Sequence, residues 1–438
     1  MIKHDVVRME LPKPLLLVIT QVYVPDPSSV GQHMADAAEA LAARGHRVRV
    51  LTSARGYEDP KIKYPARERR AGVDVVRLPL SSFGKSSLAH RLLGQGLFLL
   101  QVIVRGVFAP RLAGIVVSTS PPMASFAALV ISFIRRVPIT YWLMDLNPDQ
   151  IVAQGKVTGR NPLVLAMRWL NRRIYARAAD VVVLDRYMAE RVKRQYRVPG
   201  RMEVLAPWPH ELAFDEAAAG ANPFRAEHQL DGRFVVMYSG NHSPASPVAT
   251  LLQAALRLRD DPRFIFMFIG GGLGKREVDE TIAAQGPANI VSLPYQPLER
   301  IKYSLSAADL HVVTLGNDMV GIIHPCKIYG AMAAGRPVLV IGPQPSHAAD
   351  LIDQHEIGWR VNHGDVDSVV EAIRHAAEMR AEARLNMGRR GQAAIRNHYG
   401  KSRLCGEFCD VVERTIAPAE AVLPSEAPRR AAVGEAGH

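Results

Sequence analysis

A lysine at the start of a helical segment is the residue that most suggests chemistry. Lys327 lies in VGIIHPCKIYGAMAAGRPVLVIG, residues 320–342, and Pro325 before it suits a first helical turn. The N–H groups of Cys326, Lys327 and Ile328 are then expected to be free donors, which with an ammonium group suit a diphosphate. The alternative is a surface lysine, although a cation opposes the helix dipole at this end. We therefore predict that Lys327 faces an anion.

Three other loops follow apolar runs and combine glycine with polar side chains. They are PDPSSVGQHM, SGNHSPASP and IGGGLGKRE. The residues in them that could contact a phosphate or a substrate are Gly31, Gly240, Asn241, His242, Gly272 and Lys275. The third loop does not match a triphosphate-binding loop, because Ile269 stands where glycine is needed and Arg276 where serine or threonine is needed. Each loop alone is also typical of an ordinary turn.

Alternating strands and helices must position these loops. Apolar runs such as PLLLVIT and FVVMYSG are typical of buried parallel strands, and helical segments such as HMADAAEALAARGH separate them. The alternation fails between Pro207 and Arg233 and then restarts. We predict an α/β fold with two Rossmann-like doubly wound parallel-sheet domains, over residues 1–215 and 232–390. Such sheets bind ligands beyond the carboxyl ends of their strands, so two facing domains form a cleft there.

The chain as a whole is basic, with a formal net charge of +12 over 438 residues. This balance favours anionic partners such as phosphorylated substrates or a membrane surface, while nucleic acid is a poor candidate because no RNA-type aromatic motif occurs. The N-terminus has no signal segment and the three cysteines have no zinc-ligand spacing, which predicts a cytoplasmic protein without a metal site. Residues 417–438 lack periodicity and are predicted to be disordered.

The segment LAHRLLGQGLFLLQVIVRGVF, residues 88–108, raises the question of membrane contact. Arg91 and Arg105 interrupt it, and its uninterrupted apolar run is shorter than the roughly 20 residues that span a bilayer. The favoured interpretation is a buried or half-buried helix. The alternative is a helix that lies on an anionic membrane surface.

Taken together, the loops resemble a known family. The runs GQHMADAAEALAARGHRVRVLTS, STSPPMASFAAL, YWLMDLNPD, MYSGNHSP, FIGGGLGKRE and HPCKIYGAMAAGRPVLVIGP are collinear within residues 14–400. In order and spacing they resemble the nucleotide-sugar-dependent glycosyltransferases of family four, which have the GT-B fold. The resemblance is strongest to the branch that acts in bacterial exopolysaccharide and O-antigen synthesis.

The resemblance implies an acceptor-binding first domain and a second domain that binds a UDP- or GDP-sugar, with Tyr295 and Gln296 near the base. It implies a C-terminal helix, residues 391–416, that crosses back to the first domain. It also implies transfer with retained anomeric configuration, without a cofactor or an obligatory metal. The acceptor in this branch is often a lipid-diphosphate-linked glycan, which implies work at the inner face of the plasma membrane.

This sequence departs from the family pattern at several positions. Val320 and Ile328 stand where the family carries two glutamates, of which one contacts the donor sugar and the other the ribose. Asn241 and Ser246 stand where it carries the arginine and lysine that hold the donor diphosphate, and Met144 stands where it carries a histidine. The resemblance therefore leaves Lys327 as the first candidate for the diphosphate.

Asp145 is the second candidate catalytic residue. It follows the apolar run PITYWLM and could orient the acceptor or the donor sugar, or instead cap the helix of NPDQIV, a role that Asp149 could also fill. A retaining transferase is the leading hypothesis, since a front-face reaction lets the leaving phosphate accept the acceptor's proton. The alternatives are a sugar-nucleotide 2-epimerase of the same architecture and a catalytically silent subunit that binds the nucleotide sugar.

Overall fold

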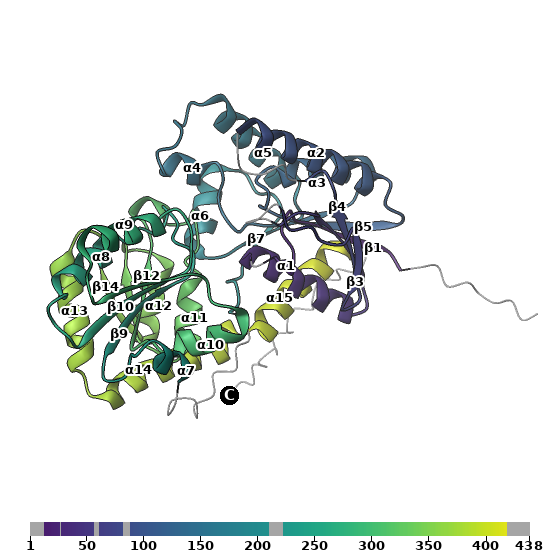
Figure 1. Cartoon of the computed structure of the whole chain (residues 1–438). Coiled ribbons are helices and arrows are strands. Elements are labelled where there is room, and N and C mark those ends of the chain that lie inside the picture. The colour runs from purple at the N-terminus through teal and green to yellow at the C-terminus, as the bar shows by residue number, and fades with distance from the viewer. Residues whose placement is uncertain (1–12, 27, 57–60, 82–87, 210–221, 418–438) are drawn as a thin grey trace, which may run out of the picture.

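Two α/β units lie side by side in the computed structural model, which describes residues 13–26, 28–56, 61–81, 88–209 and 222–417 (Figure 1). Each unit has one central sheet covered by helices. The predicted tail from residue 418 onward lies outside the described residues.

The first unit is built on an eight-stranded sheet in the order β3-β4-β2-β1-β5-β6-β7-β8. Its strands are β1 (Leu15–Ile19), β2 (Arg47–Ser53), β3 (Arg67–Arg70), β4 (Val73–Leu78), β5 (Leu112–Ser118), β6 (Ile139–Trp142), β7 (Asp180–Val183) and β8 (Arg201–Val204). Its helices are α1 (Ser29–Ala43), α2 (Leu88–Val107), α3 (Ala124–Arg135), α4 (Asp149–Ala153), α5 (Pro162–Arg177) and α6 (Arg186–Gln195). Only β3 runs antiparallel to its neighbour.

The second unit is built on a six-stranded, fully parallel sheet in the order β11-β10-β9-β12-β13-β14. Its strands are β9 (Phe234–Ser239), β10 (Phe264–Ile269), β11 (Ile290–Leu293), β12 (Leu310–Thr314), β13 (Val338–Ile341) and β14 (Gly358–Val361). Its helices are α7 (Pro223–Glu227), α8 (Ala249–Arg257), α9 (Lys275–Gln285), α10 (Leu298–Ser306), the 3₁₀ turn η2 (Asn317–Met319), α11 (Lys327–Ala333), α12 (His347–His355), α13 (Val366–Glu378) and α14 (Ala381–Ala394).

Strands β1 and β10 are apolar along their whole length, because helices cover both faces of each sheet. All five residues of β1 and all six of β10 are buried. The predicted fold class is therefore confirmed. The strand order reverses at β1 and β5 in the first sheet and at β9 and β12 in the second, and such switch points are where doubly wound sheets bind ligands.

The chain returns to the first unit at its end. After α14 come one π-helical turn, η3 (Ile395–Tyr399), and an extended Gly400, so the helix expected over residues 391–416 begins only at Lys401, as α15 (Lys401–Ile416). Figure 1 shows α15, in yellow, running beside α1. Its Thr415 hydroxyl donates to the buried Asp180 carboxylate at 2.6 Å.

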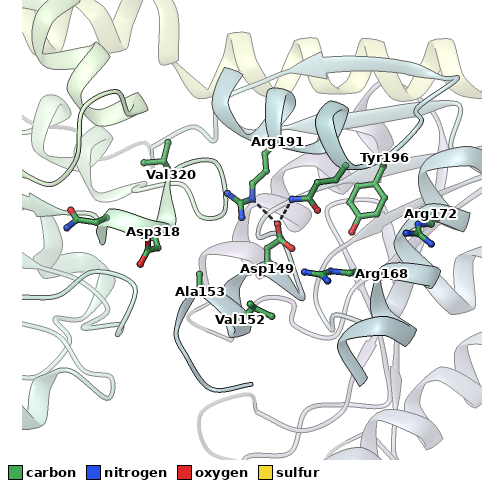
Figure 2. A pocket seen from close by; sticks show the side chains of 11 residues that line it. Asp149, Val152, Ala153, Arg168, Arg172, Arg191, Tyr196, Asp318 and Val320 are labelled. Carbon is green, nitrogen blue, oxygen red and sulfur yellow. Dashed lines mark hydrogen bonds and ion pairs between the residues drawn. The ribbon is translucent and has the colours of Figure 1, made fainter. Parts of the chain in front are cut away.

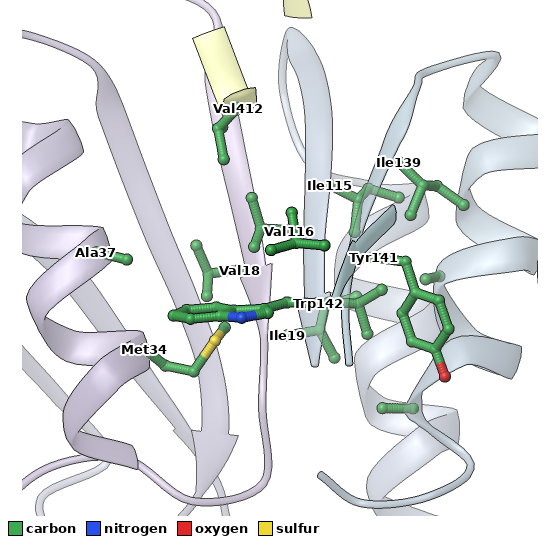
Figure 3. Close-up of a cluster of buried hydrophobic side chains, with 14 of the residues drawn as sticks. Val18, Ile19, Met34, Ala37, Ile115, Val116, Ile139, Tyr141, Trp142 and Val412 are labelled. Atoms are coloured by element: carbon green, nitrogen blue, oxygen red, sulfur yellow. The ribbon is translucent and has the colours of Figure 1, made fainter. Parts of the chain in front are cut away.

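Trp142 at the end of β6 forms the centre of the packing beneath α15. Its ring lies 4.1 Å, centroid to centroid, from that of Phe408 on α15. Figure 3 shows the indole among Val18 of β1, Met34 of α1 and Val412 of α15, with Val116 of β5 to one side. The first hydrophobic core therefore includes residues from both ends of the chain.

Helix α2 fits the half-buried interpretation of residues 88–108. Phe98 and Val102 are fully buried, whereas Leu93, Leu100 and Val104 are exposed. Within the described residues, the chain forms no helix that combines the length and the apolar character needed to cross a bilayer.

Candidate functional site

The segment after β12, residues 315–327, joins the second unit to the first. Ile323 forms an isolated antiparallel bridge with Asp145, and the Leu146 N–H donates to the Ile322 carbonyl at 2.9 Å. The loop after β6 and the segment that ends on Lys327 therefore face each other between the two units. These loops leave the carboxyl ends of β6 and β12, where ligands are expected.

Lys327 is the first residue of α11 and lies over the loop after β9. A Cβ built on Gly240 would lie 2.9 Å from Lys327 Cε, and Gly240 has a φ of +124°. Only glycine combines that backbone conformation with the space that the lysine stem fills. The Lys327 Nζ lies 5.2 Å from the centroid of the Tyr238 ring. The ammonium group is thus held near the switch point between β9 and β12.

The free N–H groups expected beside Lys327 are only partly present. The Cys326 N–H donates to the His324 carbonyl at 2.9 Å and the Ile328 N–H to the Pro325 carbonyl at 3.2 Å. That part of the prediction is wrong, because tight turns that precede the helix use these donors themselves. Ile328 and Pro325 are also buried, Ile328 in the core beneath α11, so the ammonium remains the feature of this turn suited to an anion.

Two glycine loops pack against each other next to Lys327. A Cβ on Gly272 would lie 2.2 Å from Asn241 Oδ1, and one on Gly270 would lie 2.0 Å from the Gly240 carbonyl oxygen. His242 is buried, and its Nδ1–H donates to the Gly240 carbonyl at 3.1 Å. Burial and the charges of the neighbouring lysines lower the pKa of His242 to about 4, so the ring is neutral at pH 7.

Lys275, predicted as a possible phosphate or substrate contact, bonds to the backbone in this structure. Its Nζ donates to the carbonyls of Phe268 and Leu293, at 2.5 and 2.8 Å, near the ends of β10 and β11. Burial lowers its pKa to about 8. The ammonium thus links two strand ends, and the phosphate contact expected of Lys275 stays a prediction that its third N–H donor would have to serve.

The remaining predicted contact residues lie at the rims of the two sheets. Gly31 is buried in the first turn of α1, where a Cβ would lie 3.2 Å from the Tyr23 backbone, so its small size serves close packing. Tyr295 is 47% exposed and follows β11, with its hydroxyl 3.4 Å from the Gly271 carbonyl, and Gln296 comes next in the same loop.

The half-buried Asp145 is joined to Ile323 through its backbone, and its carboxylate has no capping role. Helix α4 begins at Asp149 with no side-chain cap, so neither Asp145 nor Asp149 caps it, and the capping alternative is wrong. Among the described residues, the Asp145 carboxylate has no hydrogen-bond partner. Burial raises its pKa to about 6. Burial, together with the charge of Asp145, raises the pKa of the Cys326 thiol to about 12. Asp145 therefore lies close to Cys326, the residue that precedes Lys327.

A buried polar chain that the sequence did not reveal holds the Lys327 segment. His324 Nδ1 lies 2.8 Å from the Asp185 carboxylate of the first unit, and its Nε2 lies 2.9 Å from the Tyr329 hydroxyl, which in turn lies 2.9 Å from His347 Nε2. Burial would raise the pKa of Asp185, but the hydrogen bond and charge of His324 hold it below its usual range. The only hint in the sequence is a histidine directly before Pro325.

A cavity of about 740 Å³ lies between α4, α5 and α6 of the first unit and η2 of the second (Figure 2). Arginines on α5 and α6 line one side, and Asn317, Asp318 and Val320 line the other. Val320 belongs to the segment that ends on Lys327, so the cavity adjoins the cleft. In the sequence these arginines are part of the general basic balance, and nothing there indicates that they share a cavity.

Comparison with known proteins matches both units to family models. Residues 29–208 match the "Glycosyl transferase 4-like domain" and residues 221–394 match "Glycosyl transferases group 1". The probable glycosyltransferase WbjE of Pseudomonas aeruginosa is 25% identical over 235 residues, or 54% of this chain and 58% of WbjE. The putative colanic acid biosynthesis glycosyl transferase WcaI of Escherichia coli is 25% identical over 380 residues, or 82% of this chain and 91% of WcaI.

Solved structures share the same arrangement of two units. Sucrose-phosphate synthase of Thermosynechococcus elongatus superposes with a TM-score of 0.72 at 15% identity, covering 92% of this chain and 99% of that one. Anabaena HepE in complex with UDP and glucose superposes with a TM-score of 0.67 at 16% identity, covering 92% of this chain and all of that one. These likenesses concern the fold, which is GT-B.

Proposed function

Because this chain belongs to the GT-B glycosyltransferases of family four, with a 4-like domain followed by a group 1 domain, we propose that it transfers a sugar from a UDP- or GDP-sugar to a glycan acceptor linked to a lipid diphosphate. We propose that the anomeric configuration is retained and that the product serves bacterial surface polysaccharide synthesis. The relatives WbjE and WcaI, the latter a putative colanic acid biosynthesis glycosyl transferase, support this choice.

The position of Lys327 is the observation that carries the proposal. Its stem lies against Gly240 at the switch point of the second sheet, and its segment contacts the first unit through Asp145 and Leu146. HepE has been crystallised with UDP and with UDP-glucose, which supports a nucleotide sugar as the donor class. Tyr295 and Gln296 lie in a loop of the second unit suited to contact with the base.

The chemistry that we propose concentrates on the leaving diphosphate. When the bond between sugar and diphosphate breaks, negative charge grows on the β-phosphate, and a fixed cation stabilises that charge in proportion to its development. Lys327 supplies this cation. The acceptor's hydroxyl attacks the anomeric carbon, and its proton passes to a phosphate oxygen, so no separate protein base is needed. Asp145, ionised above about pH 6, orients the sugar or the acceptor's hydroxyl.

We propose a membrane-facing surface on α2 and α3, which we call the apolar face and define as Leu100, Val104, Phe108, Phe133 and Ile134. Each of these side chains is exposed, Phe108 by 80% and Phe133 by 82%. The Arg135 guanidinium donates to the Val107 and Ala109 carbonyls on either side of Phe108, which holds the two helices together at this corner. An apolar face of this kind suits attachment to the inner face of the plasma membrane.

The experiment that tests the proposed function is a transfer assay. Radiolabelled UDP- and GDP-sugars are supplied to the purified protein with membranes that contain lipid-linked acceptors. We expect label to enter the lipid fraction from one sugar nucleotide, with the anomeric configuration of the donor. Transfer with inversion, or only to water-soluble acceptors, would contradict the corresponding part of the proposal.

A further inference from the structure

The cavity between the units has a cationic wall formed by one helix. Arg168 and Arg172 stand one turn apart on α5, so their side chains lie on the same side of the helix. Figure 2 shows both side chains beside Tyr196 of the loop after α6. Two guanidinium groups one turn apart carry ten N–H donors, most of which can serve an anion in the cavity.

These two arginines are largely free of acidic partners, in contrast to the third. Arg191 donates to the Asp149 carboxylate at 2.8 Å, and Gln195 donates to the same oxygen at 2.8 Å, as the dashed lines in Figure 2 mark. Arg168 makes one hydrogen bond, to the Gly159 carbonyl at 3.2 Å. Among the described residues, Arg172 has no hydrogen bond or ion pair. Neither Arg168 nor Arg172 is therefore paired with a carboxylate, although Asp149 and Asp318 also line the cavity.

The opposite wall places this cationic pair beside the transfer site. Asn317, Asp318 and Val320 precede Ile323, which pairs with Asp145, and the same segment ends on Lys327. Asp318 and Asn317 can exchange hydrogen bonds with sugar hydroxyls. A ligand in the cavity would thus have its phosphate at α5 and its sugar toward the cleft.

Apolar side chains flank the arginines on α5. Leu165 and Trp169 are each 52% exposed, and their spacing from Arg168 and Arg172 puts all four on one contiguous strip of the helix. A strip that alternates guanidinium and apolar groups suits a molecule in which a phosphate is joined to a hydrocarbon chain.

We propose that the cavity is the acceptor subsite, that Arg168 and Arg172 bind the acceptor's diphosphate, and that Leu165 and Trp169 contact the prenyl-type chain attached to it. This inference rests on the proposed function and assigns its acceptor a place. The shared chemistry is a diphosphate, which could also come from a soluble molecule or from the donor itself. The experiment must separate these sources.

Calorimetric titrations of the full chain distinguish them. UDP and GDP are titrated first, and failure of both to bind contradicts the proposed function itself. Farnesyl diphosphate, inorganic diphosphate and farnesol are then titrated with the donor site filled by the nucleotide that binds. We expect farnesyl diphosphate to bind more tightly than inorganic diphosphate, and farnesol to bind weakly. Arg168→Gln and Arg172→Gln should each lower the affinity for farnesyl diphosphate about tenfold or more. Both should leave the affinity for the nucleotide unchanged.

Arg194→Gln is the matched control, because Arg194 lies on the exposed side of α6, paired with Glu190, outside the cavity. It should bind farnesyl diphosphate as the wild type does. If the nucleotide binds but abolishes farnesyl diphosphate binding, or if the two arginine variants match the control, the inference fails while the proposed function stands. Equal affinity for farnesyl diphosphate and inorganic diphosphate would overturn the hydrocarbon contact.

Discussion

At the scale of single residues, neither Asp145 nor Lys327 has a side-chain hydrogen bond or ion pair among the described residues, and Lys327 contacts the Tyr238 ring only through its charge. The Asp145 carboxylate is partly buried with a raised pKa, and it lies near Cys326, the residue before Lys327. A carboxylate whose charge is disfavoured by its surroundings lowers the stability of the folded chain at neutral pH. Such groups concentrate at functional sites. His242 and Lys275, by contrast, bond to backbone carbonyls and shape the loops.

Asp145→Asn tests whether this carboxylate is held at an energetic cost. The folded chain keeps the Asp145 proton up to about pH 6, whereas the unfolded chain loses it near 3.8, so the stability of the wild type falls as pH rises between these values. Since Asp145 is partly exposed, we expect the variant to be more stable by about 1–2 kcal/mol at pH 7 and equal at pH 4. Urea unfolding at the two pH values measures this.

The same variant has an activity readout. Wild-type kcat/KM should rise with pH to a plateau above about 6, and Asp145→Asn should lose most of its activity together with this rise. A variant with no gain in stability at pH 7, or with the pH profile of the wild type, would show that Asp145 is neither strained nor functional.

At the scale of elements, the segment of residues 315–327 is held by contacts from both units. Its His324 is paired with Asp185, whose carboxylate also accepts the Met188 N–H at the start of α6. The pair is nearly inaccessible to solvent. It therefore fixes the turn before Lys327 relative to the first unit.

Asp185→Asn should destabilise the protein by about 2 kcal/mol at pH 7, because it leaves His324 with a weaker buried partner. The pKa of Asp185 is lowered in the folded state, so its contribution is full at neutral pH and is lost as pH falls below 3.8. Asp350→Asn is the matched control, since Asp350 meets Arg186 across the units in a more exposed pair, and it should cost below about 1 kcal/mol. Equal effects would contradict the role given to the buried pair.

The strands and the glycine loops could be predicted from the sequence because each is encoded locally. The apolar runs of β1 and β10 are visible in the sequence without knowledge of any distant residue. The same is true of the glycines at 240 and 272. The backbone partners of the Cys326 and Ile328 N–H groups could not be predicted, since they depend on how tightly the turn winds.

Contacts between residues far apart in the chain could not be predicted from the sequence either. His324 and Asp185 are 139 positions apart, and Lys275 reaches a carbonyl 18 positions away. The arginine-lined cavity exists only where the two units meet, so composition shows its charge and nothing of its place. The spacing of strands and helices in the sequence did predict that ligands bind at the carboxyl edge of each sheet.

At the scale of the whole molecule, α15 completes the first unit. Phe408 is fully buried against Trp142, so Phe408→Ala should cost about 3–4 kcal/mol through lost burial and the cavity left behind. Phe133→Ala is the control, because Phe133 is 82% exposed and its loss should change stability by about 0.5 kcal/mol or less. Thermal unfolding of both variants measures the difference, and similar melting temperatures would contradict this packing.

The apolar face on α2 and α3 predicts membrane attachment that can be measured directly. The wild type should float with vesicles of phosphatidylcholine and phosphatidylglycerol, and Phe108→Ser with Phe133→Ser should largely remain in the soluble fraction. Leu385→Ser is the control, since Leu385 is an exposed apolar residue of the second unit, and it should float normally. Equal flotation of all three proteins would contradict the placement.

The central claim is that Lys327 binds the donor diphosphate, and calorimetric titration of UDP and GDP tests it most directly. One of the two nucleotides should bind the wild type. Lys327→Met should fold normally but bind that nucleotide with an affinity about tenfold lower or more. Lys302→Met is the control, because Lys302 packs on its neighbour Tyr303 on α10, and it should bind as the wild type does. Binding of the nucleotide with equal affinity to wild type and Lys327→Met would contradict the account.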